Sequence, residues 1–251
     1  MCIKSFVISV MVDTFALTKY IDMSASGVLK RSVFKKVLAA FTGLFLCLFL
    51  VGHLAGNLQL LFPLMGHSTA EAQTAFNEYA LFMTTNPAVK IMSYITYFSI
   101  LFHAVMGIYL ARKNRQARPV GYGKNNVSAN SMWSSRNMGL LGIVIMAFIV
   151  LHMSDFWFKM HFGPIGEDPN GLTDLYSLVI TKFGQLWYVA LYVVCMIAVA
   201  LHLVHGFQSG FQSLGLNHPT YTPIIKKTGL AFAIIIPLLF AIIPVAIFLT
   251  A

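Results

Sequence analysis

Residues 37–62 read VLAAFTGLFLCLFLVGHLAGNLQLLF and contain no Asp, Glu, Lys or Arg. A bilayer core of about 30 Å needs about 20 residues of helix, so this stretch is long enough to cross it. Four further long, apolar runs follow at 87–111, 138–158, 183–214 and 228–251. Because lipid offers the backbone no hydrogen-bond partners, each run is predicted to be a helix. The predicted fold is all-α, a polytopic membrane bundle with five transmembrane helices.

The composition of the chain supports lipid as its solvent, because 58% of the residues are hydrophobic and only 10% are charged. The formal net charge of +9 could suggest nucleic-acid binding, but the basic residues lie between apolar runs and not on a soluble recognition fold. We therefore expect no nucleic acid partner. The cysteines show no paired spacing, and without a CxxCH motif covalent c-type haem is not indicated.

Basic residues gather on one side of the predicted bundle, which sets its orientation. Cytoplasmic loops accumulate Lys and Arg, so the loops that hold them and the N-terminus should be in the cytoplasm, and the C-terminus should be outside. These residues precede the first run, separate the second from the third, and separate the fourth from the fifth: Lys30, Arg31, Lys35, Lys36, Arg112, Lys113, Arg115, Arg118, Lys124, Arg136, Lys226 and Lys227. The remaining loops carry Glu71, Glu78, Glu167, Asp168 and Asp174.

Residues 1–29 form an N-terminal extension, and residues 30–251 form the transmembrane domain. The extension has an apolar run that is interrupted by Asp13 and is too short to span a membrane with confidence. It is interpreted as an interfacial segment, or as sequence upstream of a true start at Met23. A cleaved signal peptide would place the mature N-terminus outside, against the basic residues that follow.

Histidines recur in the first four apolar runs. His53, His103, His152 and His202 take one run each, and His205 lies one turn after His202. Imidazole at membrane depth usually faces the bundle interior, where it bonds a neighbour, carries protons or binds metal. A single histidine would be explained by packing, but four histidines in four successive spans favour a shared role.

The depths of these histidines sort them into two layers. At about 1.5 Å of rise per residue, His53 lies about 25 Å beyond Lys36 and His152 about 24 Å beyond Arg136, which puts both in the outer half.

His103 lies about 14 Å from Arg112, and His202 about 20 Å before the helix break expected at Gly215, by the same helical rise, which fits the inner half. Each layer thus draws one imidazole from each of two helices, as bis-histidine haem ligation requires. A zinc site would need three or four ligands at one point, which two depths forbid. Glycines near the histidines, including Gly43, Gly52 and Gly206, would leave room for haem but equally serve close helix packing.

Three segments resemble the single-chain, five-helix, two-haem cytochrome b anchor of bacterial succinate dehydrogenases and fumarate reductases. They are TGLFLCLFLVGH at 42–53, LFHAVMGIYLARK at 101–113 and LHLVHGFQSGFQSLG at 201–215, and the likeness runs from about residue 30 to the end. The resemblance implies that His53 and His152 ligate an outer b-type haem, and that His103 and His202 ligate an inner one. It favours His202 over His205, because the family's ligand precedes a glycine by four positions.

The same resemblance implies a bacterial inner-membrane protein that binds flavoprotein and iron–sulfur subunits on the cytoplasmic face and passes electrons to quinone, with menaquinone expected. No dicarboxylate chemistry is expected of this chain alone, since it lacks the motifs for it. Where the family often has polar residues for a haem propionate, this chain has Ala39 and Ala40, so Arg112 and Lys113 are the propionate candidates. A proton-carrying glutamate of some relatives is replaced by Ala200.

A quinone site needs a proton donor or acceptor near the membrane surface, and Glu78 with Asn77 is the predicted candidate. A solvated loop carboxylate explains Glu78 equally well. Two other functions stay open for the chain. One is the cytochrome b subunit of another respiratory complex, of the hydrogenase or formate dehydrogenase type. The other, less favoured, is a transporter whose histidines form a proton relay.

Overall fold

The computed structural model describes residues 32–116 and 133–250. Within them the chain is helical throughout, apart from turns and one isolated bridge between Glu167 and Thr173. Lys30, Arg31, Arg118, Lys124 and the N-terminal extension, on which sequence predictions rest, lie outside the described residues.

Five helical segments are long and apolar enough to cross a membrane, which confirms the predicted fold class. The first is α2 (Ser32–Asn57), which continues through the short helix η1 (Leu58–Met65); the second is α4 (Pro87–Gln116). The third joins α7 (Met138–His152), the π-helical turn η2 (Met153–Phe158) and α8 (Lys159–Phe162). The last two are α10 (Leu186–Ser213) and α11 (Tyr221–Thr250). The chain is therefore a multi-pass membrane protein.

Two regions expected to be loops are helical. One is α3 (Thr69–Thr85), where Ser68 and Glu71 form a capping box, a signal that the sequence S-T-A-E carries. The other is α9 (Leu175–Phe183), capped by the side chain of Asp174. The fourth span begins at Leu186 and not at residue 183 as predicted, because the chain turns between α9 and α10.

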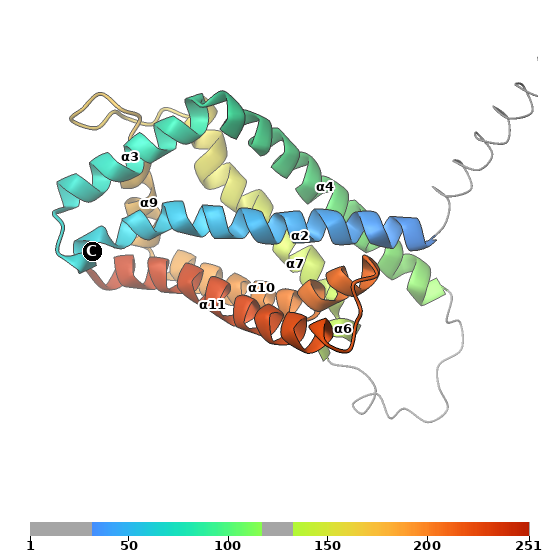
Figure 1. Ribbon diagram of the computed structural model, residues 1–251. Coiled ribbons are helices and arrows are strands. Elements are labelled where there is room, and N and C mark those ends of the chain that lie inside the picture. Colours follow the sequence, from blue (N-terminus) through green and yellow to red (C-terminus); the bar gives the residue numbers. More distant parts are fainter. Residues whose placement is uncertain (1–31, 117–132, 251) are drawn as a thin grey trace, which may run out of the picture.

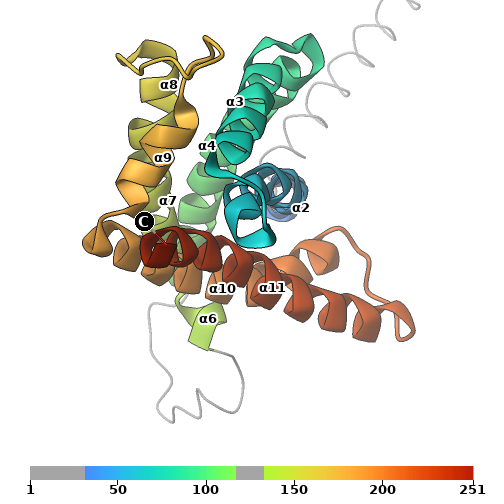
Figure 2. The same cartoon turned by 90° about the vertical axis from the view of Figure 1, so that its left-hand side faces the viewer.

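The spanning helices pack around α2, which runs the length of the bundle (Figure 1). The antiparallel pair α10 and α11 lies along one side of α2 and α4 lies along another, while α7 packs against α4 and α10 (Figure 2). At one end of the bundle lie η1, α3 and α9. A core of buried side chains lies at this end and includes Leu54, Phe76, Phe156, Tyr176 and Tyr188.

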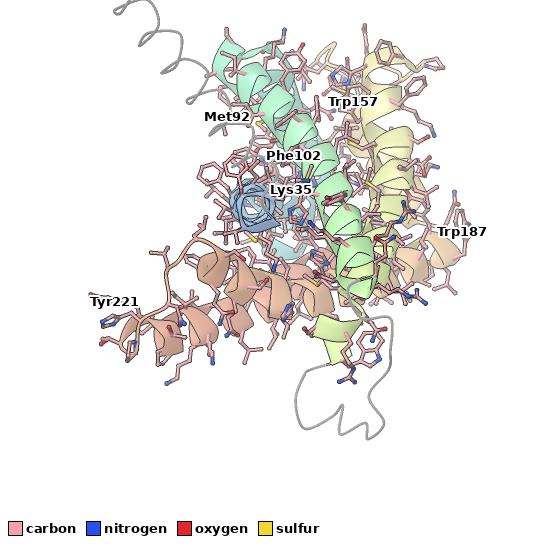
Figure 3. The ribbon with its side chains drawn as sticks, turned by 90° about the vertical axis from the view of Figure 1, so that its right-hand side faces the viewer. Lys35, Met92, Phe102, Trp157, Trp187 and Tyr221 are labelled. Carbon is pink, nitrogen blue, oxygen red and sulfur yellow. The ribbon has the colours of Figure 1, made fainter. Side chains whose placement is uncertain are left out.

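The outer surface of the spans is apolar, as contact with lipid requires. Met92, Trp187 and Leu249 keep about half or more of their surface exposed, and Figure 3 shows the first two on the outside of the bundle. In water such a surface would be a large aggregation-prone patch, whereas in hydrocarbon it costs nothing.

Charge divides the two ends of the bundle. The end where α2 starts and α4 stops, called here the basic end, also carries the small helix α6 (Trp133–Arg136) and the start of α11. Lys35, Lys36, Arg112, Arg136 and Lys226 belong to it. All acidic residues in the described part of the chain belong to the other half of the structure, here called the acidic end: Glu71, Glu78, Asp155, Glu167, Asp168 and Asp174.

Close packing of α10 on α11 depends on Gly229. A Cβ there would lie 2.6 Å from Cδ1 of Phe207, whose ring is itself packed against Phe232. We expect Gly229→Ala to lower the thermal unfolding midpoint in detergent, since overpacking costs about 1–3 kcal/mol. Gly142→Ala is the matched control, because a Cβ there meets nothing within 4 Å. An equal effect of both changes would contradict this packing.

Candidate functional site

The four histidines of the spanning helices come together as two pairs. The rings of His53 on α2 and His152 on α7 have centroids 5.8 Å apart and stand perpendicular. The rings of His103 on α4 and His202 on α10 have centroids 6.2 Å apart and an interplanar angle of 72°. These side chains are neighbours as the depth argument predicted; haem ligation by them stays a prediction.

The two pairs occupy different levels of the bundle, and α2 gives a measure of the separation. Gly43 lies against the ring of His103, because a Cβ at Gly43 would be 2.8 Å from its Cε1. His53 is ten residues further along the same helix, which corresponds to about 15 Å. The pair formed by His53 and His152 is therefore nearer the acidic end, and the other pair nearer the basic end.

The spacing of each pair fits two imidazoles on one iron. An imidazole nitrogen binds a metal at about 2 Å, so two imidazoles that held one iron between them would have ring centroids roughly 6 Å apart. Edge-to-face packing of two rings covers the same range of distances. The hydrogen bonds of the rings therefore carry more information than the spacing does.

His103 is held so that one ring nitrogen stays available. Its Nδ1 lies 2.9 Å from the carbonyl oxygen of Ala39, which can only accept, so Nδ1 carries the proton and Nε2 the lone pair. Metal-binding histidines are commonly oriented through such a bond. The hydroxyl of Thr42 lies 3.4 Å from the same nitrogen and donates to backbone carbonyls of α2.

His202 has a buried ring nitrogen that the polypeptide leaves unsatisfied. In the described part of the chain no hydrogen-bond partner reaches its Nδ1. Such a group costs about 1–3 kcal/mol if nothing bonds it. Among the described residues this nitrogen is the one buried side-chain atom that needs a partner from outside the chain. The ring that meets His103 is that of His202, in line with the choice of His202 over His205.

Aromatic side chains surround the pair near the acidic end. Phe49 stacks on His53 at a centroid distance of 5.3 Å, and Phe240 of α11 lies at 5.6 Å from the same ring. Phe148 and Phe156 flank His152 at 5.9 and 5.4 Å. Flat apolar walls of this kind suit the body of a macrocycle, and the residues present therefore fit haem.

The glycines near the histidines have different neighbours from those that sequence proximity suggested. Gly43 is on the same helix as His53 but lies against His103, because ten residues of helix carry it to the other level. Gly56 receives the ring of Tyr79 from α3. Gly206 does lie near His202, with its Cβ position 3.7 Å from Cδ2 of that ring. Gly52 would meet nothing within 4 Å.

The propionate candidates Arg112 and Lys113 lie exposed in the last turns of α4. Arg112 is nine residues beyond His103 along this helix, or about 14 Å. Both residues are at the basic end, on the same side as the inner pair. Their contact with a propionate stays a prediction.

Asn77 has a structural role that the sequence did not reveal. Its side chain is 1% exposed and joins α3 to the start of α9. Nδ2 donates to Asp168 and to Asp174, each at 3.0 Å, while Oδ1 accepts from the backbone N–H of Tyr176 at 3.0 Å. These bonds engage both ends of the amide within the fold. Glu78, the other quinone candidate, is exposed on the next position of α3.

Asp155 was not among the predicted site residues, although the sequence carries a signal for it. Asp155 is the one acidic residue within the five spans, and a carboxylate at that depth requires partners. It lies in the π-helical turn η2 that directly follows His152, and π-helical turns are frequent at functional sites. Tyr192 of α10 contacts the histidine that precedes this turn, because its hydroxyl lies 3.1 Å from Nδ1 of His152.

The Asn77 bonds generate a pH-dependent prediction. Hydrogen bonding by Asn77 lowers the pKa of Asp168 below its ordinary value of 3.8. A lowered folded-state pKa adds stability above that ordinary value and loses it as the pH falls toward the lower folded pKa. We expect the thermal unfolding midpoint in detergent to drop below about pH 4.

Asn77→Ala should lower the midpoint already at neutral pH, since an unsatisfied buried N–H of Tyr176 costs about 1–3 kcal/mol. Its further loss in acid should be smaller than that of the unaltered chain. Glu78→Gln is the control at neutral pH and should leave the midpoint unchanged. A normal midpoint for Asn77→Ala would show that these bonds add no stability.

Comparison with known proteins adds no relative: no family model matches the chain, and no curated protein or solved structure is significantly similar to it.

Proposed function

We propose that the chain is the di-haem cytochrome b anchor subunit of a succinate:quinone oxidoreductase. His53 and His152 would hold one b-type haem, and His103 and His202 the other. Four imidazoles from four different spanning helices form two pairs of neighbouring rings, at two different levels of the bundle. This observation supports the proposal. Bound haem would supply one-electron transfer between iron(II) and iron(III).

The residues of the chain would bind the two groups and keep them in a dry environment. The carbonyl of Ala39 keeps the proton of His103 on Nδ1, so that Nε2 can act as a ligand. The rings of Phe49 and Phe240 exclude water from the pair near the acidic end. Low water access and neutral imidazole ligands favour electron transfer over chemistry at the iron.

The basic end would face the cytoplasm, following the rule that cytoplasmic loops are rich in Lys and Arg. The protein would then lie in the bacterial inner membrane, and the flavoprotein and iron–sulfur subunits would dock at this end. Lys35 lies there and bonds the hydroxyl of Tyr109 at 3.1 Å. The pair formed by His103 and His202 would be the nearer one to the iron–sulfur partner.

Quinone, for which we propose menaquinone, would react near the acidic end. Glu78 is exposed there on α3 and can exchange protons with water. Asn77 is not part of this proposal, because its amide is engaged with Asp168, Asp174 and Tyr176.

The decisive experiment is haem quantitation on the purified protein. We expect two protohaems per chain, and a reduced-minus-oxidised spectrum of the b type. His53→Ala and His103→Ala should each remove about one haem, because each ligand pair loses one member. His67→Ala is the control, since this exposed histidine lies outside both pairs.

Haem quantitation, together with the identity of the subunits that co-purify, separates the possible functions. A protein without haem would reject the proposal and favour a histidine relay. Haem together with a hydrogenase or formate dehydrogenase partner, in place of a flavoprotein, would assign the chain to another respiratory complex. Co-purification with a succinate-oxidising flavoprotein would support the proposal.

The orientation has its own test. Alkaline phosphatase fused after the last residue should be active in a bacterial host, because the C-terminus would lie outside and the enzyme matures only there. A fusion at Asn217, between α10 and α11, should be inactive because this turn would face the cytoplasm. The reverse activities would place the basic end outside.

A further inference from the structure

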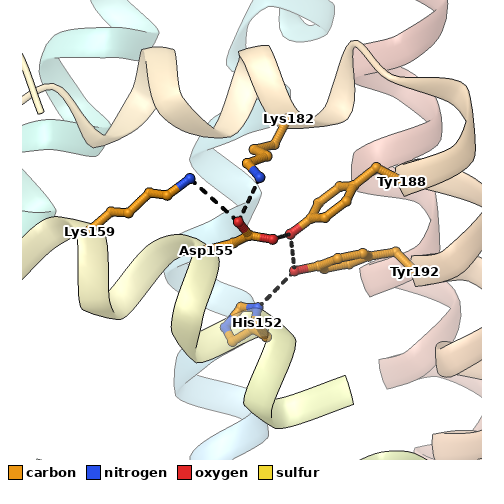
Figure 4. A network of polar contacts seen from close by, with 6 residues as sticks. All are labelled: His152, Asp155, Lys159, Lys182, Tyr188 and Tyr192. Carbon is orange, nitrogen blue, oxygen red and sulfur yellow. Dashed lines mark hydrogen bonds and ion pairs between the residues drawn. The ribbon is translucent and has the colours of Figure 1, made fainter. Parts of the chain in front are cut away.

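Asp155 is the terminus of a chain of polar contacts that reaches His152 (Figure 4). Its Oδ1 accepts from Nζ of Lys182 of α9 at 2.6 Å, and from Nζ of Lys159 at 3.4 Å. Its Oδ2 accepts from the hydroxyl of Tyr188 at 3.0 Å. Two ammonium groups therefore stabilise the carboxylate, and a carboxylate can only accept hydrogen bonds.

Two tyrosines of α10 connect Asp155 to His152 through hydrogen bonds. The hydroxyls of Tyr188 and Tyr192 lie 3.2 Å apart, and the hydroxyl of Tyr192 lies 3.1 Å from Nδ1 of His152. Tyr188 is 2% exposed and Tyr192 is 6% exposed. Both phenols are thus buried between α10 and the end of α7, where each polar atom needs a partner.

The number of protons fixes the direction of every bond in this chain. Each tyrosine hydroxyl has one proton to donate. Tyr188 gives its proton to Asp155, so the contact between the two tyrosines requires the proton of Tyr192. The oxygen of Tyr192 is then left only to accept, and Nδ1 of His152 must be the donor. Nε2 of His152 consequently holds the lone pair.

We propose that Asp155, Tyr188 and Tyr192 are positioning residues that impose this tautomer on His152 and thereby prepare Nε2 as the ligand of the outer haem. The inference rests on the proposed function for the identity of the bound group. The turn η2 takes part, since it places the carboxylate three residues after the ligand and within reach of α9 and α10. None of these three residues binds the iron itself.

The hydrogen bonds from His152 to Asp155 also make the two haem sites unequal. His103 donates to a neutral backbone carbonyl, whereas His152 donates into a series of hydroxyls that ends on an anion. A hydrogen bond from Nδ1 toward negative charge raises the basicity of the other ring nitrogen, which stabilises the oxidised metal. Breaking this series of hydrogen bonds should therefore raise the reduction potential of the outer haem and leave that of the inner haem unchanged.

A purely structural role is the alternative, because the same contacts join η2, α9 and α10. Loss of such a role would lower stability without altering the tautomer of His152 or one haem potential selectively. Tyr97→Phe provides the matched control. The Tyr97 hydroxyl accepts from Nε1 of Trp157 at 2.7 Å, so its removal also deletes a partly buried phenol bond to the third span, but one that leads to neither of the two histidine pairs.

The experiment uses the full chain in detergent with two measurements. Nitrogen NMR of histidine-labelled, haem-free protein reports which nitrogen of His152 carries the proton. A redox titration of the haem-loaded protein reports the potential of each haem. In the unaltered chain we expect the proton on Nδ1. Tyr192→Phe should give a mixture of tautomers and raise one of the two potentials, whereas Tyr97→Phe should change neither measurement.

Asp155→Asn is the more severe variant, because a carboxamide can donate to Tyr188 and so reverse every bond in the chain. Nδ1 of His152 would then accept, the proton would move to Nε2, and the outer haem should be lost while the inner haem stays. Asp155→Glu restores an acceptor and should recover the outer haem. The retained inner haem reports that each variant is folded. If Tyr192→Phe fails to fold, Tyr188→Phe breaks the series of hydrogen bonds one step further from His152. It should raise the same reduction potential by a smaller amount.

The results separate this inference from the function on which it rests. Haem in the unaltered chain, with both potentials and the His152 tautomer unmoved in Tyr192→Phe, would overturn the positioning role and leave the proposed function standing. Absence of haem from the unaltered chain would overturn the function, while the NMR measurement would still decide whether Tyr192 sets the tautomer.

Discussion

Hydrocarbon gives an imidazole nothing to bond with, and the arrangement of this bundle follows from that constraint. A histidine at membrane depth must find its partners on other helices or on a bound group. His103 bonds the backbone of α2, and His152 bonds a phenol of α10. His202 has a nitrogen with no partner among the residues described. Each ring also approaches a second ring from another span, so the polar groups of four helices converge at two places.

The helix α2 contributes to both histidine pairs, but in different ways. At one level it contributes the side chain of His53, and at the other it contributes a backbone carbonyl and the small residue Gly43. A helix with a larger residue at position 43 could not approach His103 as closely. The sequence between Ala39 and His53 thus meets two distinct demands, close contact at its start and an aromatic enclosure at its end.

The acidic end is built to hold polar groups that the membrane would not solvate. Asn77 joins α3 to the loop before α9, and Lys182 joins α9 to Asp155 in the third span. Buried polar groups that are fully bonded make an arrangement more specific, since any displacement leaves one of them unpaired. The helices at this end therefore restrain the end of α7, where His152 lies.

The sequence by itself determined the all-α fold, the approximate limits of the five spans and the grouping of the four histidines by depth. Length, hydropathy and helical rise suffice for these, because each is a property of one helix crossing a layer of known thickness. The helix α3 was also readable in principle from its capping box. Only the tertiary structure decided which atoms meet: that Gly43 faces His103, that Asn77 is enclosed, and that Asp155 connects to His152 through two tyrosines. Those contacts depend on how helices distant in the sequence rotate and tilt against one another, and no periodicity within one helix records that.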